Sequence, residues 1–461
     1  MQSLLLETKL GNITPLKFTS ILIDNYYSSQ LYQTAKFDVF PSNCHKSASV
    51  NSLALESVDY RFLLSGSGDS SIKLWDLHQR DEVRKENEVD AKLNAIHHPS
   101  KFDTFDYDNP VTVFSNVAIM PAREFHKFGI STIQWWPFDT GLFVSSSFDH
   151  TVKVWDTNEL TPVFSFNLNN RVYSIDVCGD SSLIAAASDQ PFVRLLDMRS
   201  SSSAHTLRGH KGKTLSVKWH PINSNLLASG GYDGEVRIWD IRRSSNLLCR
   251  LDMLTTNTSN SLSRQEANLT QQSVKAHSGP VNGLCWDESG STLFTAGNDD
   301  KIRVWDMIST PYPPVNKLIN FGPLTRNKYP QTIPILLNPS GESELQHLVF
   351  PSESGEVLIF RTVDGKLVNR LIRRGTKNVG RTCSMCNGGP FTATYYCGTV
   401  DGEILCWKPF WDKIDPEEVL DLEEEKGTGV TSDDGVDVDE ILLKKHTLAL
   451  KAQELKKSME Y

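Results

Sequence analysis

A short motif ending in Trp-Asp returns along the chain and constrains the fold more than any other feature. It consists of a basic residue, an apolar residue, Trp and Asp, and each Trp stands six residues after an earlier Asp. The copies are Lys73–Asp76, Lys153–Asp156, Arg237–Asp240 and Arg303–Asp306. Self-similarity of this kind predicts one small unit that is repeated and stacked, so that each unit buries its apolar face against the next. Repeats of this type form binding surfaces more often than active sites.

The spacing of the motif predicts propeller blades. The Asp that precedes each Trp falls at Asp69, Asp149, Asp233, Asp299 and Asp401, and a weaker copy at Asp189 ends in Leu196-Asp197. The steps from Asp149 to Asp189 and from there to Asp233 are 40 and 44 residues, the length of a four-stranded blade. The interval between Asp299 and Asp401 leaves room for one more blade around residues 348–360. We therefore expect an all-β, seven-bladed β-propeller.

The local pattern within one copy agrees with this expectation. Residues 215–219 alternate between apolar and polar side chains, residues 226–229 form a short apolar run, and residues 235–240 alternate again. Tyr232-Asp233-Gly234 supplies a turn between the second and third of these segments.

His210, which lies 23 residues before Asp233, resembles the Gly-His that opens a WD repeat. His126 and His277 have corresponding places. The resemblance implies that each repeat holds a structural tetrad, in which a His, a strand Ser or Thr, the turn Asp and the Trp are linked by hydrogen bonds. The expected tetrads are His45, Ser65, Asp69, Trp75; His126, Ser145, Asp149, Trp155; His210, Ser229, Asp233, Trp239; and His277, Thr295, Asp299, Trp305.

Two chemical alternatives deserve comparison with this structural interpretation. A Ser/His/Asp set also suggests nucleophilic catalysis, but several copies around a ring cannot all be active sites, and we expect these hydroxyls to be buried. Cys383 and Cys386, with Cys397 and Cys406, suggest zinc. However, Cys397 takes the place that Ser229 has in its repeat, so we expect strand cysteines in a blade core. We expect no enzyme activity, no cofactor and no metal.

The charge distribution points to protein partners. The formal net charge is -9, and residues 412–461 hold 15 acidic against 7 basic side chains, whereas the rest of the chain is close to neutral. Direct DNA binding usually requires a basic face, and no Lys/Arg cluster announces one. The eight Cys lack a disulfide-type spacing, and the N-terminus lacks the order of a secretory signal. We expect a soluble protein of a reducing compartment, the nucleus or cytosol, with no membrane contact.

The remaining segments define the domain organisation. Residues 1–34 are dense in apolar side chains and predict a helical leader, with Thr14 as N-cap and a helix from Pro15. This leader docks either on a partner or on its own propeller. Phe37–Phe40 is expected to supply the outer strand of the last blade. The propeller then spans residues 35–411, with insertions at about 80–120 and 251–273, and residues 412–461 form a flexible acidic tail with a possible C-terminal helix.

One segment carries a more specific likeness. Ser131 to Thr157, which includes Gln134-Trp135-Trp136-Pro137-Phe138 and the run Val144-Ser145-Ser146-Ser147-Phe148-Asp149, closely resembles the second repeat of the Cockayne syndrome group A protein family. The likeness continues through residues 276–285 and ends at residues 401–409, so it covers residues 45–410. Lys9–Ile13 is similar to the fungal branch, where the protein is a Rad-type repair factor.

This resemblance implies a substrate receptor of a cullin-RING ubiquitin ligase that acts in transcription-coupled nucleotide excision repair in the nucleus. In that family an N-terminal helix-loop-helix docks on the large damage-specific DNA-binding adaptor, which joins the receptor to the cullin and the RING protein. Receptors of this class also tend to carry Arg two places after the Trp-Asp motif. The adaptor-binding residues implied are Arg199, Arg242, Leu5, Leu10, Leu16, Phe18 and Ile21. The alternative for each Arg is an ion pair with its own blade.

The family likeness also implies a repair factor, associated with stalled RNA polymerase II, on the opposite propeller face, and a monomer within the complex. The competing interpretation is a WD-repeat scaffold in chromatin or repair that has no link to a ligase. Several features depart from the family pattern. The insertion and the tail are long, the sixth blade is eroded, and the seventh has Arg374-Gly375-Thr376 in place of Gly-His.

Overall fold

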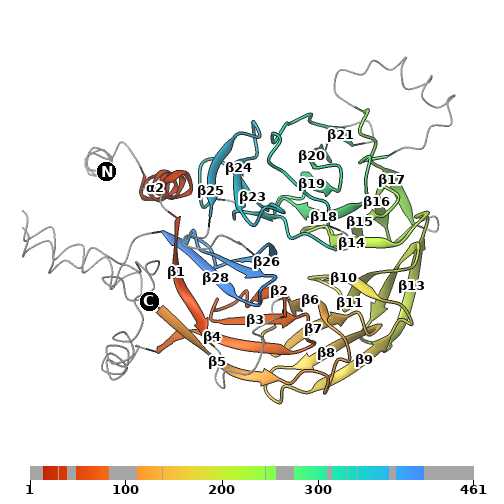
Figure 1. Ribbon diagram of the computed structural model, residues 1–461. Helices are drawn as coiled ribbons and strands as arrows, with labels where there is room; N and C mark the ends of the chain where they lie inside the picture. The colour runs from red at the N-terminus through yellow and green to blue at the C-terminus, as the bar shows by residue number, and fades with distance from the viewer. Residues whose placement is uncertain are drawn as a thin grey trace, which may run out of the picture. The chain divides into compact units, whose positions relative to one another are not determined.

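Four-stranded antiparallel sheets are the repeating unit of the computed structural model shown in Figure 1. The structure describes residues 14–29, 31–38, 48–81, 112–137, 139–243, 246–255, 275–308, 314–329, 331–339, 341–372 and 380–409. The chain divides into two compact units, Met1–Pro409 and Phe410–Tyr461. The second unit lies outside the described residues, and so do His45, Leu5, Leu10 and most of both insertions.

Seven blades follow one another along the chain, which confirms the expected seven-bladed architecture. Blade 1 contains β2 (Val50–Leu55), β3 (Phe62–Ser67), β4 (Ile72–Asp81) and β5 (Thr112–Met120); blade 2 contains β6 (Ile130–Trp135), β7 (Leu142–Ser147), β8 (Thr151–Asp156) and β9 (Pro162–Asn167). Blade 3 contains β10 (Val172–Val177), β11 (Leu183–Ser188), β12 (Phe192–Asp197) and β13 (Ser202–Arg208); blade 4 contains β14 (Thr214–Trp219), β15 (Leu226–Gly231), β16 (Val236–Asp240) and β17 (Leu247–Arg250).

The remaining blades include the two that the sequence marks most weakly. Blade 5 contains β18 (Val281–Trp286), β19 (Thr292–Gly297), β20 (Lys301–Asp306) and β21 (Val315–Asn316); blade 6 contains β22 (Leu336–Leu337), β23 (His347–Pro351), β24 (Val357–Arg361) and β25 (Leu367–Leu371). Blade 7 contains β26 (Thr382–Asn387), β27 (Tyr395–Thr399), β28 (Ile404–Pro409) and the N-terminal strand β1 (Leu31–Asp38). The blade that was placed around residues 348–360 is therefore blade 6.

The N-terminal strand closes the ring. β1 pairs antiparallel with β28 and parallel with β5, so it joins the outer strands of blades 7 and 1 in one eight-stranded sheet. This arrangement removes two sheet edges that would otherwise be open to other chains. The strand begins at Leu31 rather than at Phe37, and the helix before it ends at Ser29. The boundary between leader and propeller thus falls at residue 30, earlier than the predicted residue 34, because pairing with β28 recruits residues 31–36 into the sheet.

Apolar side chains form seven clusters, one at each contact between neighbouring blades. The motif Trp lies within them, and Trp75, Trp155, Trp239 and Trp305 are among the largest fully buried side chains. Leu196, Phe360 and Trp407 stand at the same register position in blades 3, 6 and 7, and they are also buried. A bulky apolar group at this position is enough to fill the space between blades, which is why blades 3 and 6 form without a Trp-Asp motif.

Each blade has two ends with different connections. At one end, turns join the first strand to the second and the third strand to the fourth, and we call this end the lower face. The other end, which we call the upper face, has the turns between the second and third strands and the connections from one blade to the next. Gly234, in such an upper turn, has a φ of +79°, a conformation that favours glycine.

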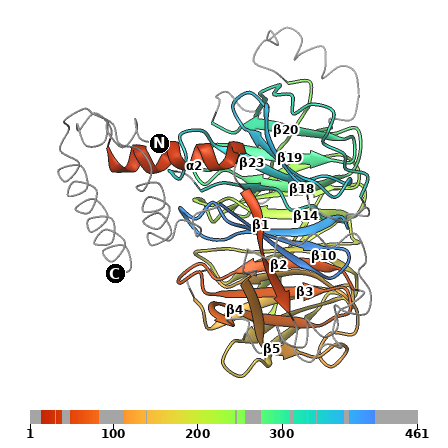
Figure 2. The ribbon, with the colours of Figure 1, turned by 60° about the vertical axis from the view of Figure 1, so that its left-hand side comes forward.

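The helix α2 (Pro15–Ser29) precedes β1. Its start agrees with the sequence, since the main-chain N–H of Lys17 donates to Thr14 Oγ1 at 3.3 Å and Pro15 occupies the first turn, as expected for an N-cap. Figures 1 and 2 show α2 beside blade 6. In the described part of the chain, no helix has both the length and the apolar content needed to cross a bilayer.

Candidate functional surfaces

The four predicted residues of the second repeat lie in one hydrogen-bonded chain. Asp149 Oδ2 lies 2.9 Å from His126 Nδ1, and His126 Nε2 lies 2.7 Å from Ser145 Oγ. Trp155 Nε1 donates to the same hydroxyl at 2.7 Å. Because an ionised carboxylate can only accept, Nδ1 donates to Asp149. In the neutral ring, Nε2 then accepts the proton of Ser145, whose oxygen accepts from the indole, so the arrangement suits a neutral imidazole beside a carboxylate.

The same contacts recur in blades 4 and 5. In blade 4, His210 Nδ1 lies 3.2 Å from Asp233 Oδ2, and Ser229 Oγ lies 2.7 Å from both His210 Nε2 and Trp239 Nε1. In blade 5, His277 lies 2.8 Å from both Asp299 Oδ1 and Thr295 Oγ1, and Trp305 Nε1 donates to Thr295 at 3.0 Å. In blade 1, Trp75 Nε1 donates to Ser65 Oγ at 2.9 Å, and Asp69 Oδ1 accepts the N–H of Ser71 at 2.9 Å. The His45 predicted for this blade lies outside the described residues.

The pKa values of the turn carboxyls reflect this bonding. Burial alone would raise the pKa of Asp233, but hydrogen bonds from His210 and from main-chain N–H groups outweigh burial and lower the pKa to about 2. The same balance holds the pKa of Asp149 and Asp299 well below the usual range. Burial lowers the pKa of His277. At neutral pH Asp299 and His277 of blade 5 are thus a carboxylate and an uncharged ring, which suits the bonding pattern.

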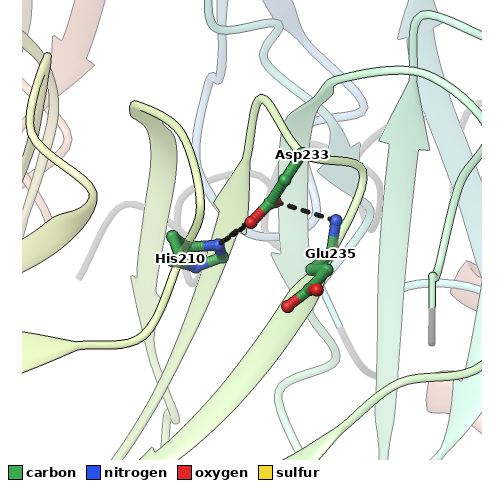
Figure 3. A group of neighbouring side chains, drawn as sticks. All are labelled: His210, Asp233 and Glu235. Carbon is green, nitrogen blue, oxygen red and sulfur yellow. Dashed lines mark hydrogen bonds and ion pairs between the residues drawn. The ribbon is translucent and has the colours of Figure 1, made fainter. Parts of the chain in front are cut away.

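The tetrad geometry does not suit catalysis. Ser145, Ser229 and Thr295 are each 0% exposed, whereas a nucleophile must reach a substrate. His210, Asp233 and Glu235 offer three ligand atoms within 4.8 Å of one another (Figure 3), the spacing of a potential metal site. However, Glu235 is held by Arg237 at 2.9 and 2.6 Å, and its N–H donates to Asp233 at 3.0 Å. Each group is already satisfied, so this cluster is structural.

Three of the four cysteines considered as zinc ligands are buried in two different cores, whereas Cys383, which was also predicted to lie in a blade core, is half-buried and lines a depression on the upper face. Cys386 and Cys406 pack between blades 7 and 1, whereas Cys397 packs between blades 6 and 7. Burial raises the pKa of the thiols of Cys386 and Cys397, and zinc binding requires thiolates. Their positions favour the predicted role as small apolar groups in strands.

The two predicted Arg residues lie on the lower face, in the turns after β12 and β16. Arg242 donates from Nε and Nη2 to the two oxygens of Asp240 at 3.1 and 3.0 Å, although its side chain is 64% exposed. The alternative of an ion pair with its own blade thus describes Arg242. The main-chain N–H of Arg199 donates to Asp197 Oδ1 at 2.9 Å, and the Arg199 side chain is exposed.

The helix α2 packs on its own propeller, which was the second of the two positions considered for the leader. Ile23 and Tyr27 are 1% and 0% exposed and belong to the core between blades 6 and 7. Of the predicted adaptor-binding residues, Leu16 is 66% exposed, whereas Phe18 and Ile21 are half-buried. The residues that anchor the helix were therefore not the ones assigned to a site. Their spacing of four residues is the one sequence signal for a shared helix face.

Polar contacts fix the anchored end of α2. Tyr27 Oη donates to Glu342 Oε2 at 2.9 Å and accepts from Tyr395 Oη at 3.0 Å. One turn earlier, Asp24 Oδ1 lies 3.9 Å from His347 Nδ1, and neither atom has a hydrogen-bond partner among the described residues. Burial raises the pKa of Glu342 and of Asp24 and lowers that of His347 to about 4.

The helix and the two Arg turns share the lower face. Glu342 belongs to the turn between β22 and β23, which joins the first two strands of blade 6. Arg199 and Arg242 lie in turns between third and fourth strands. In an antiparallel sheet these two kinds of turn lie at the same end. The lower face therefore carries both features that the family resemblance assigned to an adaptor.

A depression on the upper face was not predicted. It is lined by residues of blades 1, 2, 3, 6 and 7 and of the connection between blades 5 and 6, among them Tyr173, Arg326 and Arg381. Tyr173 lies on β10, but Arg326 and Arg381 lie in connections without periodic patterning. One sequence signal points to this region: blades 6 and 7 lack the His that precedes the well-formed repeats, so the connections before these two blades are of a different kind.

Repeated blades with buried Trp-centred tetrads define the class: this is a WD-repeat protein, and such propellers generally serve as non-catalytic interaction scaffolds. The sequence pattern described as "WD domain, G-beta repeat" matches residues 38–76, 121–156, 201–240 and 269–306. The chain is 30% identical to WD repeat-containing protein ATCSA-1 of Arabidopsis thaliana, over 78% of this chain and 85% of that protein. It therefore belongs to the WD-repeat family of ATCSA-1.

Two further relatives match over shorter regions. Radiation-sensitive protein 28 of Saccharomyces cerevisiae is 30% identical over 53% of this chain and 51% of its own length. Ribosome biogenesis protein ytm1 of Aspergillus clavatus is 30% identical over 56% of this chain and 52% of its own length. The chain thus spans about half of the length of these two relatives.

Proposed function

We propose that this protein is the substrate-receptor subunit of a cullin-RING E3 ubiquitin ligase that acts in transcription-coupled nucleotide excision repair in the nucleus. The protein supplies binding surfaces, and ubiquitin transfer belongs to other subunits of the complex. The observation that carries the proposal is the shared position of α2 and of the Arg199 and Arg242 turns on the lower face. Family membership with ATCSA-1 and the similarity to Radiation-sensitive protein 28 support it.

The lower face fits the adaptor for physical reasons. Leu16, near the start of α2, is 66% exposed, and the side chains of Arg199 and Arg242 are exposed in neighbouring blades. Apolar side chains beside Arg are typical anchors of protein interfaces. The ion pair between Arg242 and Asp240 holds the guanidinium in place, which reduces the entropy that binding would otherwise cost. The upper face then remains for the repair factor associated with stalled RNA polymerase II.

Co-purification of the tagged full chain with the adaptor tests this proposal. We expect the double variant Arg199→Ala/Arg242→Ala and the single variant Leu16→Asp to recover at least tenfold less adaptor, since interface anchors cost about 2 kcal/mol or more. Lys366→Ala is the matched control, because Lys366 is also exposed in a lower-face turn, in blade 6. Deleting residues 1–34 is a poorer test, since it removes Ile23, Tyr27 and part of β1 from the fold.

Full recovery of the adaptor by both lower-face variants would contradict the docking surface. If Lys366→Ala reduces adaptor recovery as much as the lower-face variants do, the cause is a general loss of positive charge or of folded protein rather than the loss of a specific contact. Thermal unfolding of each variant separates these cases, because the four substituted side chains are all exposed and should leave the core intact.

A second function has one observation in its favour. The buried contacts of Tyr27 and Ile23 hold α2 on its own propeller, as expected for a scaffold that has no link to a ligase. The similarity to ytm1 adds ribosome biogenesis as a setting for such a scaffold. Native mass spectrometry of complexes purified with the tagged chain distinguishes these functions. Stable complexes with pre-ribosomal or chromatin proteins, without adaptor or cullin, would favour the scaffold.

A further inference from the structure

The upper face has a depression at its centre, where the inner strands of the blades begin. Aromatic and charged side chains line it together, among them Phe148, Tyr173, Tyr329, Arg326, Arg381 and Glu353. They come from blades 2, 3, 6 and 7 and from the connection between blades 5 and 6. The site is therefore assembled from segments that are distant in the sequence.

Two guanidinium groups in this depression are available for a ligand. Arg381 lies over the ring of Tyr329 and donates from Nη2 to Cys383 Sγ at 3.4 Å. Arg326 is exposed, and its main-chain carbonyl accepts the N–H of Glu353 at 3.2 Å. Neither guanidinium forms an ion pair with a carboxylate in the segments that the structure describes. Arg242 and Arg237, in contrast, are paired within their own blade.

The connection that carries Arg326 and Tyr329 is held in a fixed position. Asn282 of blade 5 donates from Nδ2 to Asn327 Oδ1 at 3.0 Å and to the Tyr329 carbonyl at 2.9 Å. Asn327 donates in return to Asn282 Oδ1 at 2.7 Å. These two Asn side chains are fully or almost fully buried. A ligand would thus meet a preorganised surface rather than a loop that has to be ordered first.

The aromatic side of the depression is also fixed. The rings of Phe148 and Tyr173 meet edge to face, with centroids 6.0 Å apart. Tyr173 Oη donates to Asp189 Oδ1 at 2.7 Å. Lys213 Nζ lies 5.1 Å from the Tyr173 ring centroid, in the geometry of a cation–π contact. Rigid aromatic side chains beside unpaired Arg are the composition found at binding hot spots.

We propose that this depression binds an extended acidic segment of a partner protein, whose carboxylates contact Arg326 and Arg381. An apolar side chain of the same segment packs against Phe148. Charge complementarity selects this occupant, because two unpaired cations favour carboxylates. Lys213 covers a face of the Tyr173 ring, which disfavours a single-stranded nucleic acid, because such a ligand needs free rings for stacking.

This inference deepens the proposed function by giving the chemistry of the partner on the upper face. It depends on that function only for the biological identity of the partner. The contacts that carry it do not involve α2, Arg199 or Arg242. The two proposals can therefore fail separately.

The test begins with a display library of random 12-residue peptides that is panned against the full chain. Enriched peptides are labelled with fluorescein, and binding is measured by anisotropy, with a labelled oligothymidylate of twenty nucleotides as the competing class. We expect enrichment of Asp and Glu together with an apolar residue. Arg326→Ala and Arg381→Ala should each weaken binding about tenfold, as expected for loss of one charge-assisted contact. Lys366→Ala, on the other face, should have no effect.

Three outcomes would overturn the inference. The enriched peptides could lack acidic residues, or acidic peptides could bind equally well to Arg326→Ala and Arg381→Ala. The oligothymidylate could also be the probe whose binding depends on these residues. Because Arg326 is exposed, its substitution leaves the core intact, and Arg381→Lys tests the second position with the charge retained. If the Arg199→Ala/Arg242→Ala variant loses adaptor binding but still binds the acidic peptide, both proposals stand. If acidic peptides do not bind the unsubstituted protein but the adaptor does, only this inference is contradicted.

Discussion

Asp149 shows what a buried tetrad contributes to the fold. Its carboxylate accepts from His126 Nδ1 at 2.9 Å and from Lys127 N at 3.0 Å, and it bonds the turn residue Thr151. Removing the carboxylate leaves the N–H of a ring that is 1% exposed with only the longer contact to Thr151 Oγ1, at 3.2 Å, and deprives two main-chain N–H groups of their acceptor. We expect Asp149→Ala to reduce the free energy of unfolding by about 1–3 kcal/mol, the cost of unsatisfied buried polar groups.

Urea denaturation of the purified protein measures this loss. Asp189→Ala is the matched control, because Asp189 has the corresponding place in blade 3 but bonds only the partly exposed Tyr173. We expect that control to change stability by less than about 0.5 kcal/mol, as for most surface substitutions. Equal stability of Asp149→Ala and the unsubstituted protein would show that the tetrad does not have a structural role.

His347 makes the stability depend on pH in a definite direction. Burial, together with Arg361, lowers its pKa to about 4, below the ordinary value of about 6.5. As pH falls below 6.5, the unfolded chain therefore takes up a proton first. The stability that this ring contributes is complete above pH 6.5 and is lost as pH falls toward 4, by up to about 3 kcal/mol.

The comparison with His347→Gln isolates this effect. Asp24, 3.9 Å away on α2, and Glu342, which bonds the neighbouring Tyr27, have raised pKa values. Their burial costs stability when they are charged, so they act in the opposite direction as pH falls. The quantity to measure is the difference in unfolding free energy between the two proteins from pH 7.5 to pH 4.5. A difference that stays constant over this range would contradict the assignment.

At the scale of elements, one hydroxyl of α2, that of Tyr27, serves two partners on the propeller. Tyr27→Phe keeps the buried ring but removes the donor to Glu342 and the acceptor for Tyr395. We expect amide hydrogen exchange in α2 to become roughly tenfold faster or more, because an unsatisfied buried acceptor costs about 1–3 kcal/mol. Leu16→Ala is the control, since Leu16 is 66% exposed. Unchanged exchange in Tyr27→Phe would mean that the apolar contacts alone hold the helix.

The elements also show what local sequence can predict. The start of α2 at Thr14-Pro15 and the turn at Asp233-Gly234 depend on neighbouring residues, and both agree with the sequence pattern. The tetrad spacing is likewise local, because the His and the Trp of one blade are close in the chain. The partner of Tyr27, in contrast, is Glu342, 315 positions away. An amphipathic pattern predicts that a helix buries one face, but not which surface covers it.

The upper-face depression could not be predicted from the sequence for a related reason. Arg326 and Arg381 belong to connections with no hydrophobic period, so no pattern places them near Tyr173. Only closure of the ring brings these three residues together. The eroded blade 6 was found from spacing alone, and Phe360 explains why that was possible, since it fills the Trp position in the core.

At the scale of the whole molecule, the N-terminal strand determines whether the propeller is a closed ring. Lys36 pairs with Leu405 of β28 on one side and with Val113 of β5 on the other. Its strand is therefore interior to the sheet, and proline at this position removes a backbone donor and disrupts the ladder. We expect Lys36→Pro to cost about 3 kcal/mol or more, whereas Lys36→Ala, which keeps the backbone N–H, should cost less than about 1 kcal/mol.

Ring closure also predicts how the loss is distributed. Blades 1 and 7 meet through β1, and their shared core includes Val50, Trp75 and Cys406. If β1 detaches, these two blades gain exposed edges, whereas blades 3 to 5 keep all their neighbours. Hydrogen exchange in Lys36→Pro should therefore rise most in blades 1 and 7. A uniform rise in all blades would mean that the ring unfolds as one cooperative unit, and an unchanged pattern would mean that contacts between the inner strands β2 and β26 close the ring without β1.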